Sequence, residues 1–278
     1  MYDKRRVRQL IDLWLDEDTA HYDLTAQIMV EPGSRGRFFF NAREPFVVCG
    51  VEVAEMVHRA VDPDCGFEIK VADGTRVEPG AVIAVVEGDA QGILTAERVA
   101  LNLMQRLSGI ATLTARYVEE IAGTGAELVD TRKTTPGLRM LEKHAVMCGG
   151  GRNHRLALDN GIMLKDNHIA VCGSITAAVG RARAKAPLLT KIEVECDRLE
   201  QVEEALAAGA DVIMLDNMTN DDMRKAVAMA GGRVPLECSG GVRLETIRAK
   251  AETGVDVVSV GRITQSAACV DIGLDEAV

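Results

Sequence analysis

Four short stretches in the C-terminal half decide the fold, and they read Lys191-Ile-Glu-Val-Glu195, Asp211-Val-Ile-Met-Leu-Asp216, Pro235-Leu-Glu-Cys-Ser239 and Asp256-Val-Val-Ser-Val-Gly261. Each has an aliphatic centre and ends in a polar residue or a glycine. Their first residues are separated by 20, 24 and 21 positions, with helix-like segments such as residues 199–208 between them. This spacing is typical of repeated βα units, whose right-handed crossovers produce a parallel sheet.

Two further stretches of the same kind precede these four, at residues 127–130 and 161–165. Six such units predict a (β/α) barrel with fewer than eight strands. The first third of the chain differs, with strand-like segments at residues 36–42, 46–51, 67–71 and 81–86 and helical segments at 4–16 and 53–61. It predicts an α+β region with mixed or antiparallel strands. A long helix with an apolar stripe, at 95–121, marks the boundary between the two parts, and Ser108-Gly109 in its middle predicts a kink or a close helix contact.

The charge distribution points to a small anionic ligand. The chain of 278 residues has a formal net charge of −10, which argues against nucleic-acid and anionic-membrane partners. Between residues 130 and 165, however, seven Lys or Arg stand against three acids. This local excess of positive charge predicts a site for a small, multiply charged anion.

The cysteine and histidine patterns give no metal motif. The seven cysteines form no CxxC pair, and the five histidines show neither HxH nor HExxH spacing, so we expect no disulfide framework, zinc site or permanent transition-metal site. The N-terminus leads into no apolar signal region, and no apolar run is long enough to span a bilayer. We therefore expect a cytoplasmic protein.

The ends of the six predicted strands carry the candidate site, because barrel enzymes bind substrate at the carboxyl ends of their strands. These ends are Asp130-Thr-Arg-Lys133, Lys165-Asp-Asn-His168, Glu195, Asp216-Asn217, Ser239-Gly-Gly241 and Gly261-Arg262. The last two loops predict phosphate binding through backbone N–H groups. Five cationic residues are candidates to hold carboxylates and pyrophosphate, namely Arg132, Lys133, His154, Arg155 and Lys165.

Two acids and three further cations are open to more than one interpretation. Glu195 and Asp216 fit ribose hydroxyls, Mg²⁺ or a cationic sugar carbon, or alternatively a salt bridge to the cations opposite. If Thr95 caps the long helix, Arg98 lies in its first turn and forms an anion site; a surface arginine fits equally well. For Arg139 and Lys143 a solvated basic face is the favoured interpretation.

At these residues the sequence resembles the quinolinate phosphoribosyltransferases. The longest matching motifs are Asp130-Thr-Arg-Lys-Thr-Thr-Pro-Gly-Leu-Arg139, Gly149-Gly-Gly-Arg-Asn-His-Arg155, Lys165-Asp-Asn-His168, Glu97-Arg98 and Gln105-Arg-Leu-Ser-Gly-Ile-Ala-Thr112. Shorter matches are Asp23-Leu-Thr25, Ala42-Arg-Glu44, Leu215-Asp-Asn217 and Ser239-Gly-Gly241. The match follows the family's order over nearly the whole chain. Tyr22, where the family usually has Gly, and Cys238 depart from the pattern and bear on local packing.

The resemblance implies an N-terminal α+β open sandwich and an incomplete α/β barrel. It divides the chain into residues 1–108, a barrel at 109–268, and a tail at 269–278 that packs back on the N-terminal domain. The implied enzyme is a pentosyltransferase of NAD biosynthesis, which converts quinolinate and phosphoribosyl pyrophosphate to nicotinate mononucleotide, pyrophosphate and carbon dioxide. It uses Mg²⁺ and no tightly bound organic cofactor. The implied assembly is a homodimer or hexamer with active sites shared between subunits.

The resemblance also implies a role for each candidate residue. Quinolinate is expected to contact Arg132, His154, Arg155 and Lys165, with Arg98 reaching in from a neighbouring subunit. Catalysis is assigned to Lys133, Lys165, Glu195 and Asp216, and the last two are expected to hold Mg²⁺, directly or indirectly. The 5′-phosphate is expected at Ser239, Gly240, Gly241 and Gly261.

Three alternatives differ from this interpretation in chemistry. The first is a paralogue of the family from molybdate operons, acting on another substrate, which His21-Tyr22-Asp23 slightly favours. The second is a barrel aldolase with Lys165 as a Schiff-base lysine. The third is a binding subunit without activity, which the complete set of implied ligand residues argues against.

Overall fold

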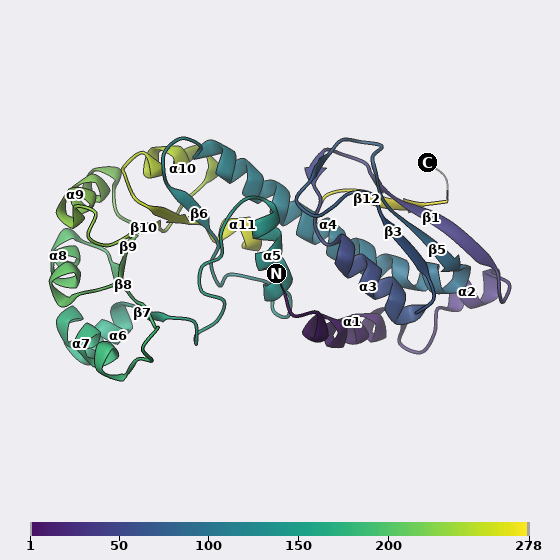
Figure 1. Ribbon diagram of the computed structural model, residues 1–278, viewed down its shortest axis with the longest axis horizontal. Helices are drawn as coiled ribbons and strands as arrows, with labels where there is room; N and C mark the ends of the chain where they lie inside the picture. The colour runs from purple at the N-terminus through teal and green to yellow at the C-terminus, as the bar shows by residue number, and fades with distance from the viewer. Residues whose placement is uncertain (1, 277–278) are drawn as a thin grey trace. The chain divides into compact units, whose positions relative to one another are not determined.

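A computed structural model describes residues 2–276, and these divide into two compact units (Figure 1). The first unit contains Met1–Ala115, Thr135–Gly150 and Ile263–Val278, apart from the end residues that are not described, and the second contains Arg116–Thr134 and Gly151–Arg262. The two units alternate along the chain. The linear boundaries at residues 108 and 268 stay a prediction.

The first unit is built on an antiparallel sheet, and we call it the antiparallel unit. Its strand order is β12-β1-β5-β3. The strands are β1 (Arg35–Ala42), β3 (Gly66–Ile69), β5 (Val82–Asp89) and β12 (Ile272–Asp275), and a separate ladder joins β2 (Phe46–Val47) to β4 (Arg76–Val77). β2 is shorter than the strand predicted at 46–51, because Gly50, with φ +97°, turns the chain into the next helix.

The helices of this unit are α1 (Lys4–Thr19), α2 (Leu24–Met29), α3 (Val51–Val61), most of α4 (Ala90–Glu120), α5 (Arg139–Cys148) and all but the first residue of α11 (Arg262–Gln265). Lys143 on α5 is only 1% exposed, so its assignment to a solvated basic face is wrong. The burial of Lys143 depends on tertiary packing, which a local sequence pattern does not show.

The start of α4 corrects the argument about Arg98. The helix begins at Ala90, where Asp89 Oδ2 accepts a hydrogen bond from the Gly92 N–H at 2.8 Å, as a capping residue does. Thr95 lies inside the helix and donates its hydroxyl to the Gln91 carbonyl. Arg98 is therefore beyond the first turn, and the predicted anion site at a helix start is wrong.

Gly109, in the middle of α4, marks a close approach and not a kink. The helix continues through it, and a Cβ at this position would lie 1.9 Å from the carbonyl oxygen of Ala268. Only glycine lets the segment before β12 pass this close to the helix.

The second unit is a six-stranded parallel sheet, and we call it the parallel unit. Its strands are β6 (Glu127–Val129), β7 (Ile162–Leu164), β8 (Ile192–Cys196), β9 (Val212–Asp216), β10 (Leu236–Ser239) and β11 (Val257–Ser259). The order is β6-β11-β10-β9-β8-β7, which confirms all six predicted strands. In the described residues no ladder joins β6 to β7, so the barrel is incomplete, as predicted. An isolated parallel bridge from Val129 to Arg152 extends the β6 edge.

Helices alternate with these strands, as the spacing predicts. They are α6 (Asp166–Cys172), α7 (Ile175–Lys185), α8 (Leu199–Ala208), α9 (Asn220–Ala230) and α10 (Leu244–Ala251). Ile213, Met214 and Leu215 are buried in succession on β9, as expected for a parallel strand covered on both faces. The strands thus hold a rigid core, and their polar carboxyl ends are left for function.

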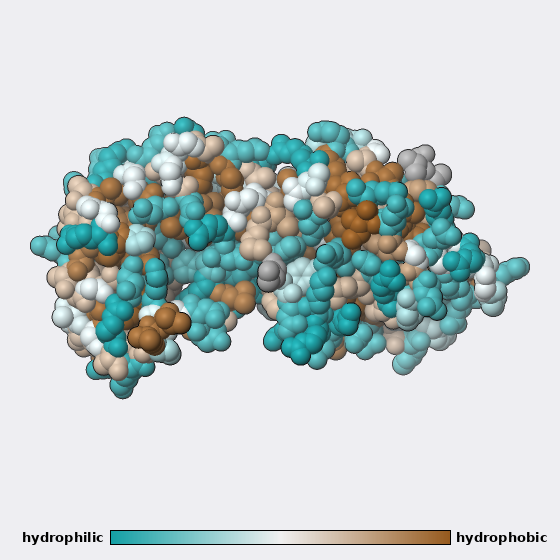
Figure 2. Space-filling model, in the orientation of Figure 1, coloured by the Kyte–Doolittle hydropathy of each residue, from teal (hydrophilic) through white to brown (hydrophobic). Residues whose placement is uncertain are grey.

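Both hydrophilic and hydrophobic residues reach the face of the molecule shown in Figure 2. Leu188 and Leu189, just after α7, are almost fully exposed. Among residues 2–276, none of the helices combines the length and the hydropathy needed to span a membrane.

Candidate active site

The candidate site is a cavity of about 540 Å³ at the carboxyl ends of the parallel strands. Its polar and glycine lining residues are Thr131, Arg132, Lys133, His154, Arg155, Lys165, Glu195, Asp216, Asn217, Glu237, Ser239, Gly240, Gly241 and Ser259. Every predicted site residue of the parallel unit is in this set except Gly261. Arg98 belongs to α4 in the antiparallel unit, and its side chain is more than half exposed. Its predicted role in a neighbouring subunit stays a prediction.

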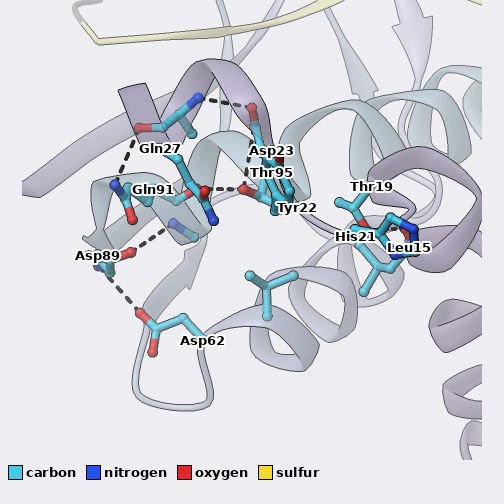
Figure 3. Close-up of a pocket in the computed structure, with 13 residues that line it drawn as sticks. Leu15, Thr19, His21, Tyr22, Asp23, Gln27, Asp62, Asp89, Gln91 and Thr95 are labelled. Atoms are coloured by element: carbon cyan, nitrogen blue, oxygen red, sulfur yellow. Dashed lines mark hydrogen bonds between the residues drawn. The ribbon is translucent and has the colours of Figure 1, made fainter. Parts of the chain in front are cut away.

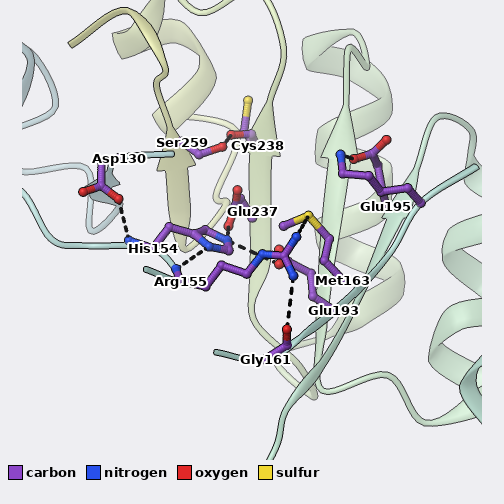
Figure 4. A network of polar contacts seen from close by, with 11 residues as sticks. Asp130, His154, Arg155, Gly161, Met163, Glu193, Glu195, Glu237, Cys238 and Ser259 are labelled. Atoms are coloured by element: carbon purple, nitrogen blue, oxygen red, sulfur yellow. Dashed lines mark hydrogen bonds and ion pairs between the residues drawn. The ribbon is translucent and has the colours of Figure 1, made fainter. Parts of the chain in front are cut away.

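Two of the cations that line the cavity are the guanidinium groups of Arg132 and Arg155. The pKa of Arg155 is lowered, first by burial and then by the like charge of Arg132. Arg155 Nη1 donates to the Gly161 carbonyl at 3.1 Å, and Nη2 lies 3.7 Å from Met163 Sδ (Figure 4). Burial is the larger cause, and the second cause is repulsion between the two positive charges. A bound anion would relieve this repulsion.

The buried Asp130 fixes the loop that carries His154. Its Oδ1 accepts the His154 N–H at 2.8 Å and its Oδ2 accepts the Asn153 Nδ2 at 2.7 Å. Asp130 follows β6 directly, so the loop is anchored to the sheet. His154 and Arg155 are held in place by this contact rather than by a regular element.

Two carboxylates lie at the imidazole of His154, as Figure 4 shows. Its Nε2 lies 3.3 Å from Glu193 Oε2 and 3.2 Å from Glu237 Oε2. These contacts raise the pKa of His154 to about 10. The Arg155 N–H, 2.7 Å from Nδ1, opposes protonation of that nitrogen. The two carboxylates favour the imidazolium form, in which Nδ1 carries a proton and the contact with the Arg155 N–H opens.

The two predicted acids differ in their partners. Glu195 Oε2 forms an ion pair with Lys165 Nζ, and Asp216 Oδ2 accepts the Asn217 Nδ2 at 2.8 Å. Lys165 Nζ is thus engaged by a carboxylate and is not free to attack a carbonyl, which disfavours the Schiff-base alternative. The ion pair also matches the salt-bridge alternative for Glu195. A ligand that binds this carboxylate therefore has to displace Lys165 from it.

The glycines at the predicted phosphate loops are required by close contacts. Gly240 has φ +88°, and a Cβ there would lie 2.2 Å from Asn217 Oδ1. At Gly261 a Cβ would lie 2.7 Å from Lys133 Cδ, so this glycine leaves space for the lysine side chain although it does not line the cavity. Both glycines therefore shape the cavity by the space they leave.

Sequence reasoning missed Glu193 and Glu237 as members of the site. A signal was present: each lies two residues before a predicted site residue, Glu195 and Ser239, on the same strand. Alternate residues on a strand point to the same face, so both side chains enter the barrel interior, where Glu237 lines the cavity.

A second cavity, of about 510 Å³, lies in the antiparallel unit (Figure 3). The charged residues in its lining are three aspartates, Asp23, Asp62 and Asp89, and neither Lys nor Arg lines it. Asp23 is engaged in capping α2, where it accepts the Ala26 N–H at 2.9 Å. An anion is therefore favoured in the parallel unit and disfavoured here.

Comparison with known proteins agrees with this geometry. Models of the N-terminal and C-terminal domains of quinolinate phosphoribosyl transferase match residues 23–108 and 110–275. The chain is 43% identical to the nicotinate-nucleotide pyrophosphorylase [carboxylating] of Mycobacterium leprae, over 96% of each chain. It is 42% identical to the probable enzyme of that name from Bacillus subtilis, over 97% of this chain and 93% of the relative.

A solved structure gives the same result. The nicotinate-nucleotide pyrophosphorylase of Francisella tularensis superposes with a TM-score of 0.95 at 38% identity, over 99% of this chain and 97% of that one. Since both domain models and these relatives extend over nearly the whole chain, it belongs to the quinolinate phosphoribosyltransferase family.

Proposed function

We propose that the cavity of the parallel unit joins quinolinate to phosphoribosyl pyrophosphate and releases pyrophosphate and carbon dioxide, leaving nicotinate mononucleotide. The observation that carries the proposal is the set of cations at the strand ends, in a chain of negative net charge. Quinolinate is a dianion, and the repulsion between Arg132 and Arg155 favours such a ligand.

We assign the quinolinate carboxylates to Arg132, His154, Arg155 and Lys165. An imidazolium and a guanidinium are both donors without acceptor sites, so they match carboxylate oxygens. His154 keeps its proton because of Glu193 and Glu237 behind it. These two carboxylates also prevent the cavity from being purely cationic, which favours release of the product.

We assign the phosphoribosyl group to the opposite part of the cavity. Its 5′-phosphate fits the backbone of Ser239, Gly240 and Gly241, with Gly261 making space for Lys133. Glu195 and Asp216 both line the cavity, and carboxylate oxygens are ligands that Mg²⁺ prefers, so these residues fit the metal. When bound, Mg²⁺ neutralises charge on the pyrophosphate.

The reaction consists of two steps, a substitution at C1 of the ribose and a decarboxylation. The pyridine nitrogen of quinolinate forms a bond to C1 of the ribose as the bond from C1 to pyrophosphate breaks; Asp216 and Glu195 stabilise the positive character at C1. The nitrogen is then cationic, and it accepts electron density from the adjacent carbon as the carboxylate leaves as carbon dioxide. A proton replaces the carboxylate. Positioning supplies most of the rate, because no covalent enzyme intermediate forms.

We further propose a cytoplasmic homo-oligomer, a dimer or hexamer, in which Arg98 of one subunit approaches the cavity of another. The exposure of Arg98 supports this assignment, since 57% of its side chain is accessible within its own subunit. The bacterial relatives and the net charge support the location and the absence of nucleic-acid partners.

The test is mass-spectrometric detection of nicotinate mononucleotide from purified protein with quinolinate, phosphoribosyl pyrophosphate and Mg²⁺. Controls omit each component in turn, and parallel samples carry Arg132→Ala or Lys165→Ala. The proposal predicts a product that needs both substrates and forms at least about 10²-fold more slowly in the variants. A folded protein that gives no product would sink the assignment and favour the paralogue that acts on another substrate.

A further inference from the structure

Outside the candidate active site, four side chains of the antiparallel unit gather at one point. They are Cys49, Asp73, His144 and Cys148, and one ligand atom from each lies within 4.8 Å of the others. Cys49 precedes α3, Asp73 follows β3, and the other two lie one turn apart on α5. We call these four residues the Cys-Asp-His-Cys cluster.

Two distances within the cluster, both from His144 Nε2, are close to the edges of a metal tetrahedron. With Zn–S of about 2.3 Å and Zn–N of about 2.0–2.1 Å, a tetrahedral angle places sulfur and nitrogen about 3.5 Å apart. His144 Nε2 lies 3.5 Å from Cys148 Sγ and 3.1 Å from Asp73 Oδ2. A single nitrogen faces both the sulfur and the oxygen, as a ligand atom does when a cation lies between them.

The surrounding structure holds these ligand atoms in place. The Cys49 N–H donates to Ser108 Oγ at 2.9 Å, and this hydroxyl donates back to the Cys49 carbonyl at 3.1 Å. Asp73 Oδ1 accepts the N–H groups of Gly50 and Val51, at the start of α3, which leaves Oδ2 turned to His144. Tyr2 packs its ring edge-to-face on His144, with centroids 5.0 Å apart.

Burial and chemistry select the kind of metal. Cys49 is fully buried, and the side chains of Asp73 and His144 are 17% and 18% exposed, so the cluster is nearly closed. Two sulfur ligands with one nitrogen and one oxygen favour Zn²⁺ over Mg²⁺ or Ca²⁺, which prefer oxygen.

We infer that the Cys-Asp-His-Cys cluster is a structural zinc site. Four protein ligands fill a tetrahedron and leave no open position, so the site joins α5 to the segments around α3 and takes no part in the reaction. Two thiolates and one carboxylate balance the ion to a net charge of −1. Because His144-x-x-x-Cys148 is the only local spacing involved and its partners are distant in sequence, no standard zinc motif reveals the site.

The test measures bound metal and its ligands directly. Full-length protein without a histidine tag is stripped with a chelator, dialysed against Zn²⁺ and analysed by mass spectrometry of the metal. The inference predicts about one zinc per chain, with an apparent Kd below about 1 μM. Replacing the zinc with Co²⁺ is expected to give the absorption band of cobalt–thiolate charge transfer.

Matched variants locate the site. Cys148→Ser and Cys49→Ser are expected to lose the cobalt–thiolate band and at least nine-tenths of the zinc. Cys172→Ser and Cys269→Ser, which lie outside the cluster, are expected to keep both. A metal at His154, Glu193 and Glu237 cannot produce the band, because those residues carry no sulfur.

The outcomes separate clearly. Unmodified protein that binds less than a tenth of an equivalent of zinc, or shows no thiolate band with Co²⁺, overturns the inference and leaves a hydrogen-bonded pair at Cys148 and His144. Loss of the band in Cys172→Ser but not in Cys148→Ser overturns it as well. If the serine variants fail to fold, as circular dichroism would show, the cobalt spectrum and Kd of the unmodified protein decide.

Discussion

A buried histidine in the antiparallel unit and a partly buried histidine in the parallel unit have opposite electrostatic environments. His58 on α3 of the antiparallel unit lies beside the rings of Phe40 and Phe67, and burial lowers its pKa to about 4. His154 in the parallel unit lies beside Glu193 and Glu237, which raise its pKa to about 10. The first histidine acts as a neutral core side chain, whereas the second is held as a cation at the edge of a cavity.

The contrast between the two histidines reflects different uses of buried side chains in the two units. In the antiparallel unit the sheet and helices bury side chains to stabilise the unit. In the parallel unit the strand ends place cationic and acidic side chains around a cavity. Stability changes are therefore expected from substitutions in the first unit, and activity changes from substitutions in the second.

The largest expected effect is on turnover. Arg132→Ala and Lys165→Ala are each expected to lower kcat/KM for quinolinate by about 10²–10³-fold, because each removes a charge-assisted contact to a reacting anion. Steady-state kinetics measures this. Lys225→Ala, which removes an exposed lysine paired with Asp222 on α9, is the control and is expected to leave kcat/KM unchanged. Equal losses in all three would contradict the assignment of the cavity.

Two glycine substitutions separate stability from activity. Gly109→Ala forces a methyl group against the Ala268 carbonyl and is expected to destabilise the antiparallel unit by about 1–3 kcal/mol. Gly240→Ala collides with Asn217 in the cavity and is expected to raise KM for phosphoribosyl pyrophosphate. Urea unfolding and kinetics distinguish the two. The comparison of the units fails if Gly109→Ala alters KM while stability is unchanged.

Much of this comparison is visible in the sequence, and some is not. Short aliphatic runs that end in polar residues predict the six parallel strands. The excess of Lys and Arg between residues 130 and 165 predicts the cations of the site. The start of α4 was misplaced, because Asp89 and not Thr95 caps it. The burial of Lys143, the carboxylates behind His154 and the Cys-Asp-His-Cys cluster depend on segments distant in sequence, which no local pattern brings together.

The two histidines predict opposite dependences of stability on pH. The folded pKa of His58 is below its unfolded value near 6.5, so its stabilising contribution is present above pH 6.5 and is lost as the pH falls towards 4, by at most about 1.4 kcal/mol per pH unit. The folded pKa of His154 is raised, so its contribution is present below pH 6.5 and is lost as the pH rises towards 10.

Measuring the unfolding of His58→Leu and His154→Gln at pH 5, 7 and 9 checks both expectations. His58→Leu should reduce the acid-side loss and His154→Gln the alkaline-side loss; the same effect from both variants would refute the distinction.

The smallest expected effect comes from the carboxylates behind His154. Glu193→Gln and Glu237→Gln each remove one negative charge, so each is expected to lower the pKa of His154 towards its ordinary value near 6.5. NMR titration of the imidazole measures this. KM for quinolinate is expected to rise above neutral pH, with kcat little changed, because the imidazolium is then lost. An unchanged His154 pKa in both variants would show that other groups hold the proton.

The central claim is that one cavity carries out both the substitution at C1 and the decarboxylation. It is tested most directly with quinolinate labelled with ¹³C in the carboxylate next to the ring nitrogen. Released ¹³CO₂, pyrophosphate and nicotinate mononucleotide are measured in the same reaction. The account predicts equal amounts of all three and unlabelled nucleotide. Pyrophosphate release without labelled carbon dioxide, or nucleotide that retains the label, would contradict it.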